Sequence, residues 1–171
     1  MHKLSRRLHY WGSFVAALPI LVILGSGILL QLKKQVEWVQ PKEIRGTGTV
    51  PAIDLHQVLA TVQTDASLGV AGWDDVSRMD IRADRGLAKV TLKNGWEVQV
   101  DLGTGKLLQS AVRRSDFIES VHDGSFFAGD LSKLGLFLPA GVVLFGLWVT
   151  GLFMFVVTWN AKRRRQAKAR D

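Results

Sequence analysis

The chain has 171 residues, a net charge of +7 and no cysteine. Without cysteine, disulfides, thiolate nucleophiles, Cys-ligated zinc and iron–sulfur clusters are all excluded. The positive charge is confined to the two ends, residues 1–7 and 162–171, whereas residues 33–133 hold 13 basic and 14 acidic residues. A basic excess that avoids the central domain is not the footprint of a nucleic-acid-binding surface, so we expect no nucleic-acid partner.

Two long stretches of the chain carry no charged residue at all, namely residues 8–32 and 134–161. Both consist mainly of Leu, Val, Ile, Phe and Gly, and roughly 20 apolar residues suffice to cross a bilayer as a helix. The sequence therefore predicts transmembrane helices over residues 11–32 and 133–159. A cleaved signal peptide would explain the first stretch less well, because the apolar run is too long and no small-x-small cleavage site follows it.

The basic tails determine the expected topology. Lys and Arg beside a transmembrane helix stay on the cytoplasmic side, where they also meet anionic lipid headgroups. We therefore expect residues 1–10 and 160–171 to be cytoplasmic tails, the lipid bilayer to be a partner, and residues 33–132 to form an extracytoplasmic domain.

Within this domain, an irregular linker over residues 35–51 precedes an amphipathic helix. Asp54 is a plausible N-cap, and His56 falls off the apolar stripe, so we expect it on the surface. The stripe consists of Leu55, Val58, Leu59 and Val62.

Apolar and polar residues then alternate over residues 77–83, 88–93 and 96–101, which predicts half-buried strands. Asn94-Gly95 is a strong hairpin signal because both residues tolerate positive φ. The run from Asp101 to Lys106 resembles phosphate-binding turns, but it lacks the full P-loop spacing and we interpret it as a second hairpin turn. The predicted class is a membrane α+β protein, with two transmembrane helices flanking a helix packed on an antiparallel sheet.

Four segments together resemble one protein family. In chain order they are Arg7–Trp11, entering the first apolar helix; Trp96–Leu108, with an aromatic-led strand and a Gly-Thr-Gly turn; Val121–Gly129; and Thr150–Leu152, late in the second apolar helix. In this order they resemble the PepSY-associated transmembrane helix family. The resemblance implies that residues 33–132 form a PepSY-like domain of the bacterial inner membrane.

The resemblance implies two alternative functions. PepSY domains include non-enzymatic modules that regulate or escort an envelope partner protein. Larger family members include ferric reductases with haem b on membrane histidines, which would make this chain an electron-transfer or reductase-accessory protein in metal uptake, although it has two crossings and not four or more. We find no nucleophile with a base and no paired carboxylates, so an enzyme is not assigned; any activity would be that of a haem-dependent oxidoreductase.

Two histidines lie where a membrane haem would need them. On a helix, His9 would share its face with small residues, and His122 precedes the second crossing beside Phe126-Phe127. Both are candidate haem ligands, and no other metal site is expected. Alternatively, His9 is an interfacial residue like its aromatic neighbours, and His122 only positions the approach to the second helix.

One chain cannot bring His9 and His122 to the same haem, because they lie on opposite faces of a bilayer about 30 Å thick. A twofold homodimer could pair each histidine with its symmetry mate. Gly146 and Thr150 have the small-x-x-x-small spacing that lets helices approach closely. This spacing suits a homodimer or a larger membrane partner, and it suits packing between the two crossings equally well.

Overall fold

The computed structural model describes residues 2–48 and 50–168. Its helices are α1 (His2–Gln31), α2 (Leu55–Gln63), α3 (Ser115–His122), α4 (Ser125–Ala128), α5 (Asp130–Ser132) and α6 (Leu138–Lys168); its strands are β1 (Val76–Arg82), β2 (Leu87–Leu92), β3 (Trp96–Asp101) and β4 (Leu107–Val112). Short 3₁₀ turns are η1 (Ala66–Leu68), η2 (Trp73–Asp75) and η3 (Ala83–Arg85), and η4 (Lys133–Phe137) is a π-helical turn. The chain divides into two compact units: residues 28–119, and those up to Gly27 together with those from Ser120 onward.

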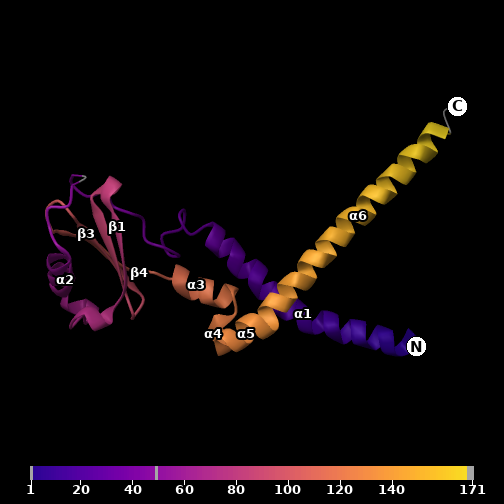
Figure 1. Ribbon diagram of the computed structural model, residues 1–171, viewed down its shortest axis with the longest axis horizontal. Helices are drawn as coiled ribbons and strands as arrows, with labels where there is room; N and C mark the ends of the chain where they lie inside the picture. The colour runs from indigo at the N-terminus through magenta and orange to yellow at the C-terminus, as the bar shows by residue number, and fades with distance from the viewer. Residues whose placement is uncertain (1, 49, 169–171) are drawn as a thin grey trace. The chain divides into compact units, whose positions relative to one another are not determined.

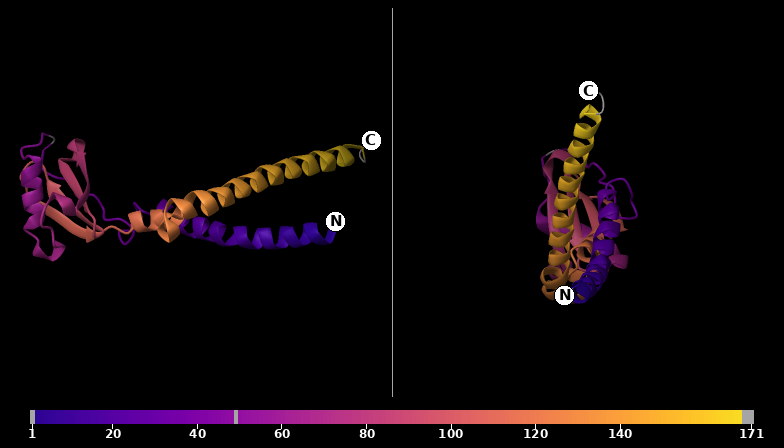
Figure 2. Two further views of the ribbon diagram at one scale, coloured as in Figure 1. Left: turned by 60° about the horizontal axis from the view of Figure 1, so that its bottom comes forward. Right: turned by 90° about the vertical axis from the view of Figure 1, so that its right-hand side faces the viewer.

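Residues 28–119 contain an antiparallel sheet with the strand order β1-β2-β3-β4. The helix α2 lies against one face of this sheet, as Figures 1 and 2 show. Between them lies the hydrophobic core, made of Val58, Val62, Leu68, Ala88, Val90, Leu92, Val98, Val100 and Leu102. The predicted helix-on-sheet arrangement is therefore present.

Local signals account for the start of α2 and for its buried face. Asp54 caps the helix by accepting a hydrogen bond from the Gln57 backbone N–H at 2.8 Å, and the Gln57 side chain accepts one from the Asp54 N–H. Val58 and Val62 are buried, but Leu55 is 52% exposed, so the apolar stripe begins one turn later than predicted.

The β2–β3 hairpin forms where the sequence predicts it, but the turn differs in type. Gly95 has φ +87°, and no described non-glycine residue has a positive φ, so Asn94 does not adopt one. Instead the Gly95 N–H donates to the Leu92 carbonyl, and the Asn94 side chain accepts from the Trp96 N–H at 3.2 Å. This is a tight turn closed by a glycine, in which Asn94 acts through its side chain.

The expectation that the strands are half-buried is wrong for β2 and β3. Lys89, Thr91, Glu97, Gln99 and Asp101, on the face away from the hydrophobic core, are at most 5% exposed. Residues 39–48, which we call the strap, cross this second face. Backbone and side-chain hydrogen bonds join the strap to the sheet, so the segment predicted to be an irregular linker is a covering layer.

The other unit contains the membrane candidates. Within the described part of the chain, one helical run, Asp130–Asn160, is long and apolar enough to cross a membrane, and Ala16–Gln31 of α1 is a shorter apolar stretch. The π-helical turn η4 leads directly into α6, whose second residue is Pro139.

Candidate functional site

His122 is the last residue of α3, and its ring is held against α1. Its Nδ1 lies 3.1 Å from the Ile23 carbonyl oxygen and 3.1 Å from Ser26 Oγ. The carbonyl can only accept, and the Ser26 hydroxyl donates its own proton to the Val22 carbonyl at 2.5 Å. Nδ1 therefore carries a hydrogen in this arrangement, and in the neutral tautomer of the ring the lone pair is then on Nε2.

A glycine allows the ring to approach the helix this closely. A Cβ at Gly27 would lie 3.3 Å from Cε1 of His122, which is tighter than ordinary side-chain contacts. The pair Ser26-Gly27 thus supplies both the hydrogen-bonding partner and the space for the imidazole.

The residues directly after His122 fix the turn into the second apolar helix. Asp123 forms an ion pair with Lys133 at 2.6 Å and accepts a hydrogen bond from the Ser125 N–H at 2.9 Å. Hydrogen bonds from Lys133 and Ser125 lower the pKa of Asp123 to about 2, against a weaker opposing effect of burial. Gly124 has φ +82°, and a Cβ there would overlap the ring of Phe137, so both conformation and space require glycine.

His122 lines a cavity of about 470 Å³ whose other walls are mainly apolar, apart from the Asp123–Lys133 ion pair, and include Phe137, Val142 and Phe145. Cavities of this size hold small ligands and cofactors, and a mainly apolar wall with one imidazole suits a haem that is held by histidine. The residues present therefore could supply one protein ligand to a haem. Among the described residues, no group of three His, Asp or Glu could hold a separate metal ion.

The other histidines are not brought to this cavity. The side chain of His9 lies outside the described residues; its backbone belongs to α1, roughly 25 Å along the helix axis from Ser26. His56 is exposed, as predicted, and its ring meets Trp73 edge-on at 6.0 Å.

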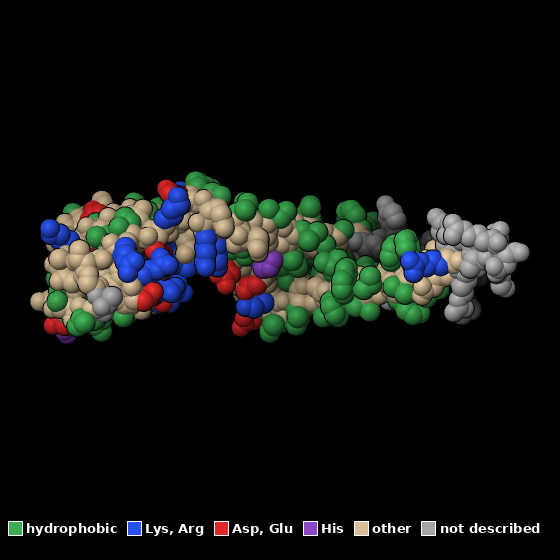
Figure 3. Space-filling view, turned by 90° about the horizontal axis from the view of Figure 1, so that it is seen from above, with side chains coloured by type: hydrophobic (Ala, Val, Ile, Leu, Met, Phe, Trp, Pro, Cys, Tyr) green, Lys and Arg blue, Asp and Glu red, His purple; other side chains and the backbone are tan. Residues whose placement is uncertain are grey.

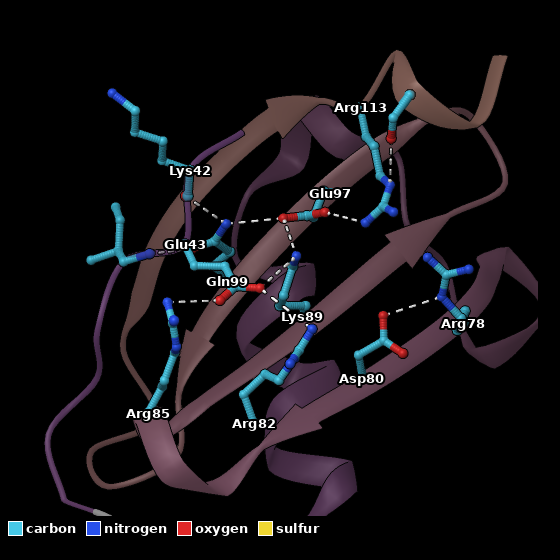
Figure 4. A network of polar contacts seen from close by, with 12 residues as sticks. Lys42, Glu43, Arg78, Asp80, Arg82, Arg85, Lys89, Glu97, Gln99 and Arg113 are labelled. Carbon is cyan, nitrogen blue, oxygen red and sulfur yellow. Dashed lines mark hydrogen bonds and ion pairs between the residues drawn. The ribbon is translucent and has the colours of Figure 1, made fainter. Parts of the chain in front are cut away.

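A second polar cluster lies under the strap, on the sheet face away from α2. Charges of alternating sign follow one another from Arg113 through Glu97 and Lys89 to Glu43 and Arg85, with distances of 2.7, 3.4, 3.3 and 2.9 Å between successive side chains. Glu97 is fully buried and the Lys89 side chain is 4% exposed. Figure 4 shows these side chains pointing toward one another across β2, β3 and the strap.

Hydrogen bonds and charge neutralisation make this burial tolerable. Gln99 donates to Glu97 at 2.9 Å and joins the strap twice, through the Lys42 carbonyl and the Ile44 N–H. Burial by itself would raise the pKa of Glu43, but Lys89 and two nearby arginines outweigh it, so the pKa is lowered. The cluster therefore consists of charged pairs whose hydrogen bonds connect β2, β3 and the strap.

Sequence reasoning missed this cluster. Lys89 and Glu97 lie on neighbouring antiparallel strands, which is the signal that could have suggested a cross-strand charge pair. Their burial depends on the strap, whose sequence has no periodic pattern.

A sequence model of one family, described as the PepSY-associated TM region, matches residues 6–171. No curated protein and no solved structure matches the chain.

Proposed function

Since the chain belongs to the PepSY-associated transmembrane family, we propose that it is a two-span bacterial inner-membrane protein that binds haem b through His122 and transfers electrons in metal uptake. Family membership and the apolar helix Asp130–Asn160 make it a membrane protein of α+β type. The haem proposal depends mainly on one observation: His122 lines a mainly apolar cavity, and its Nδ1 is held by the Ile23 carbonyl and Ser26.

Bound haem would supply one-electron redox chemistry. The chain's own residues would prepare the ligand for it. Ile23 and Ser26 accept from Nδ1–H, which fixes the tautomer and orientation of the ring and increases the basicity of Nε2. The apolar wall around Phe137 and Phe145 would exclude water from the haem edge.

An electron-transfer haem with no open coordination position needs a second protein ligand. His9 lies too far along α1 to provide that ligand to the same haem. We propose that a twofold homodimer pairs His122 with its symmetry mate near the outer face, and His9 with its mate near the inner face. A larger membrane partner could supply the same ligand. Gly141 and Gly146 of α6 support this proposal, because small residues let transmembrane helices approach closely.

The test is the visible absorption spectrum of the full-length protein, purified in detergent after expression with ample haem. We expect a low-spin b-type spectrum. His122→Ala should remove one part of it and His9→Ala another, whereas the matched control His56→Ala should leave it intact. Ser26→Ala should keep the haem but weaken its binding about tenfold or more, because the orientation of the ligand is lost.

Haem retained in full by the His9, His122 double variant would exclude both ligands. A haem-free protein from cells with ample haem would favour the alternative function, a non-enzymatic module that regulates or escorts an envelope partner protein. The position of β1 and β4 at the two edges of the sheet favours that alternative, because an edge strand can pair with a strand of a partner.

A further inference from the structure

The charged cluster under the strap opens into a cavity of about 500 Å³ in the extracytoplasmic domain. Seven Lys and Arg side chains line it, against the carboxylates Glu43 and Asp80. Figure 3 shows Lys and Arg side chains gathered on one face of this domain. Because cations outnumber carboxylates in its lining, the cavity has a positive potential that attracts anions.

The inner cations of this cavity are closely paired, whereas Arg82 is paired only weakly and Lys33 and Lys34 have no ion pair among the described residues. Lys89 and Arg113 contact the buried Glu97, and Arg85 lies 2.9 Å from Glu43. Arg82 has only a 3.7 Å approach to the same Glu43, which is too long for a hydrogen bond. Among the described residues, Lys33 and Lys34 have no carboxylate within ion-pair distance.

The remaining neighbours do not cancel this charge. Lys42 is paired with Glu37 at 2.8 Å, and Asp80 pairs with Arg78 at 3.2 Å, so neither carboxylate is left for the mouth of the cavity. The mouth therefore combines an arginine fork and two lysines, the groups that bind phosphate oxygens best.

The chain itself places this mouth close to the end of α1. Lys33 and Lys34 follow α1, which ends at Gln31, after one intervening residue, so Lys33 lies within about 8 Å of that end. On the topology proposed above, α1 ends in the outer leaflet, and the cavity is then at the depth of the lipid headgroups.

We propose that this cavity binds the phosphate group of an anionic phospholipid from the outer leaflet. Arg82 would donate hydrogen bonds to two phosphate oxygens, and Lys33 and Lys34 would add positive charge. The paired Lys89 and Glu43 would form the floor of the cavity. The bound headgroup would hold the strap side of the domain to the membrane surface. The inference depends on the proposed topology but not on haem, so the lipid effect is expected in His122→Ala protein as well.

The experiment measures the thermal unfolding of the full-length protein in neutral detergent. Dioctanoyl phosphatidylglycerol is titrated in one arm, dioctanoyl phosphatidylcholine in a second and glycerol phosphate in a third. We expect stabilisation by phosphatidylglycerol alone. Arg82→Gln should require about fivefold more of this lipid for the same shift. The matched control Arg45→Gln removes the same charge from an exposed strap residue that does not line the cavity, and it should behave as the wild type does.

Equal lipid dependence in Arg82→Gln and Arg45→Gln would overturn the proposal, because the effect would then come from overall charge. Equal stabilisation by phosphatidylcholine would overturn it as well. If glycerol phosphate alone were as effective, the cavity would be a site for a soluble anion and the lipid assignment would be wrong.

Amine labelling of the wild-type protein in nanodiscs gives a second measurement that needs no variant. Phosphatidylglycerol should slow the labelling of Lys33 and Lys34 severalfold relative to zwitterionic nanodiscs. Lys93 and Lys106, which do not line the cavity, serve as internal controls and should be labelled at unchanged rates. Equal slowing at all four lysines would contradict a specific lipid-binding site at this cavity.

Discussion

Asp101 connects the end of β3 to the strap through one carboxylate. Its Oδ1 accepts from the backbone N–H groups of Thr47 and Gly103 at 3.0 and 2.8 Å, and its Oδ2 accepts from the hydroxyls of Thr47 and Thr104 at 2.7 and 2.8 Å. Burial by itself would raise the pKa of Asp101, but these four hydrogen bonds outweigh it and lower the pKa to about 2. The ionised form is therefore the one that the fold requires.

A pH dependence of stability follows at this residue. Because the pKa in the fold is below its ordinary value of 3.8, the stabilisation is complete above about pH 4 and is lost as the pH falls toward 2. Asp101→Asn should reduce the free energy of unfolding by about 1 to 3 kcal/mol at pH 6. It should also flatten the loss of stability between pH 4 and pH 2, measured by denaturant unfolding of the detergent-solubilised protein.

Asp84→Asn is the matched control, since the Asp84 side chain is 77% exposed and its only ion pair among the described residues is a 3.9 Å contact with Arg85. Other carboxylates also titrate in this range, so the comparison is made between variants and not on the wild type alone. If Asp101→Asn and wild-type protein lost stability in parallel as the pH fell, the hydrogen bonds to Asp101 would not be the cause.

The strap and the sheet meet backbone to backbone at glycines. Gly86 has φ +64°, and a Cβ there would overlap the carbonyl oxygen of Gly48 in the strap. Gly46 donates its N–H to the Arg85 carbonyl, and a Cβ at Gly46 would overlap the Gly86 carbonyl oxygen. The strap can lie this close to η3 only because neither residue has a side chain.

Gly69 makes the strap contact measurable, because it has the same φ of +64° and a Cβ there would meet nothing within 4 Å. Gly69→Ala should cost about 1 kcal/mol in the free energy of unfolding, the conformational penalty alone. Gly86→Ala should cost at least twice as much, since it adds the collision with the strap. Equal costs in chemical denaturation would mean that the strap does not pack on the sheet in solution.

The elements of the domain were predictable where a local pattern specifies them. Alternation and the Asn94-Gly95 turn located the β2–β3 hairpin, and Asp54 located the start of α2. The strap was not predictable, since its hydrogen bonds go to Gln99 and Asp101, more than 50 residues away in sequence. Alternation shows which residues share a face of a strand, but not what covers that face.

The candidate haem site was predictable to a similar extent. His122 could be singled out because it precedes a long apolar segment. Its partners Ile23 and Ser26 could not, because helix α1 contacts it across almost 100 residues of chain and no local spacing links them. The tautomer of the ring depends on those partners, so it also had to come from the structure.

At the scale of the whole molecule, two features oppose each other in setting the topology. The basic tails favour a cytoplasmic location for both ends, whereas Lys33 and Lys34 lie on the other flank of the first apolar segment. The tails carry more charge, and the six Lys and Arg after Asn160 directly follow the helical run Asp130–Asn160. We therefore expect both ends of this chain in the cytoplasm and the sheet outside.

The absence of cysteine from the chain makes this prediction testable with single introduced thiols. Asp84→Cys lies on the exposed surface of the domain and should react with a membrane-impermeant maleimide in intact spheroplasts. Ser5→Cys and Ala167→Cys should react only after the membrane is permeabilised. Labelling of Ala167→Cys in intact spheroplasts together with Asp84→Cys would place the C-terminal tail outside. Because that tail and the domain would then share one side, the run Asp130–Asn160 could not be a crossing, and the outer haem would lose its membrane setting.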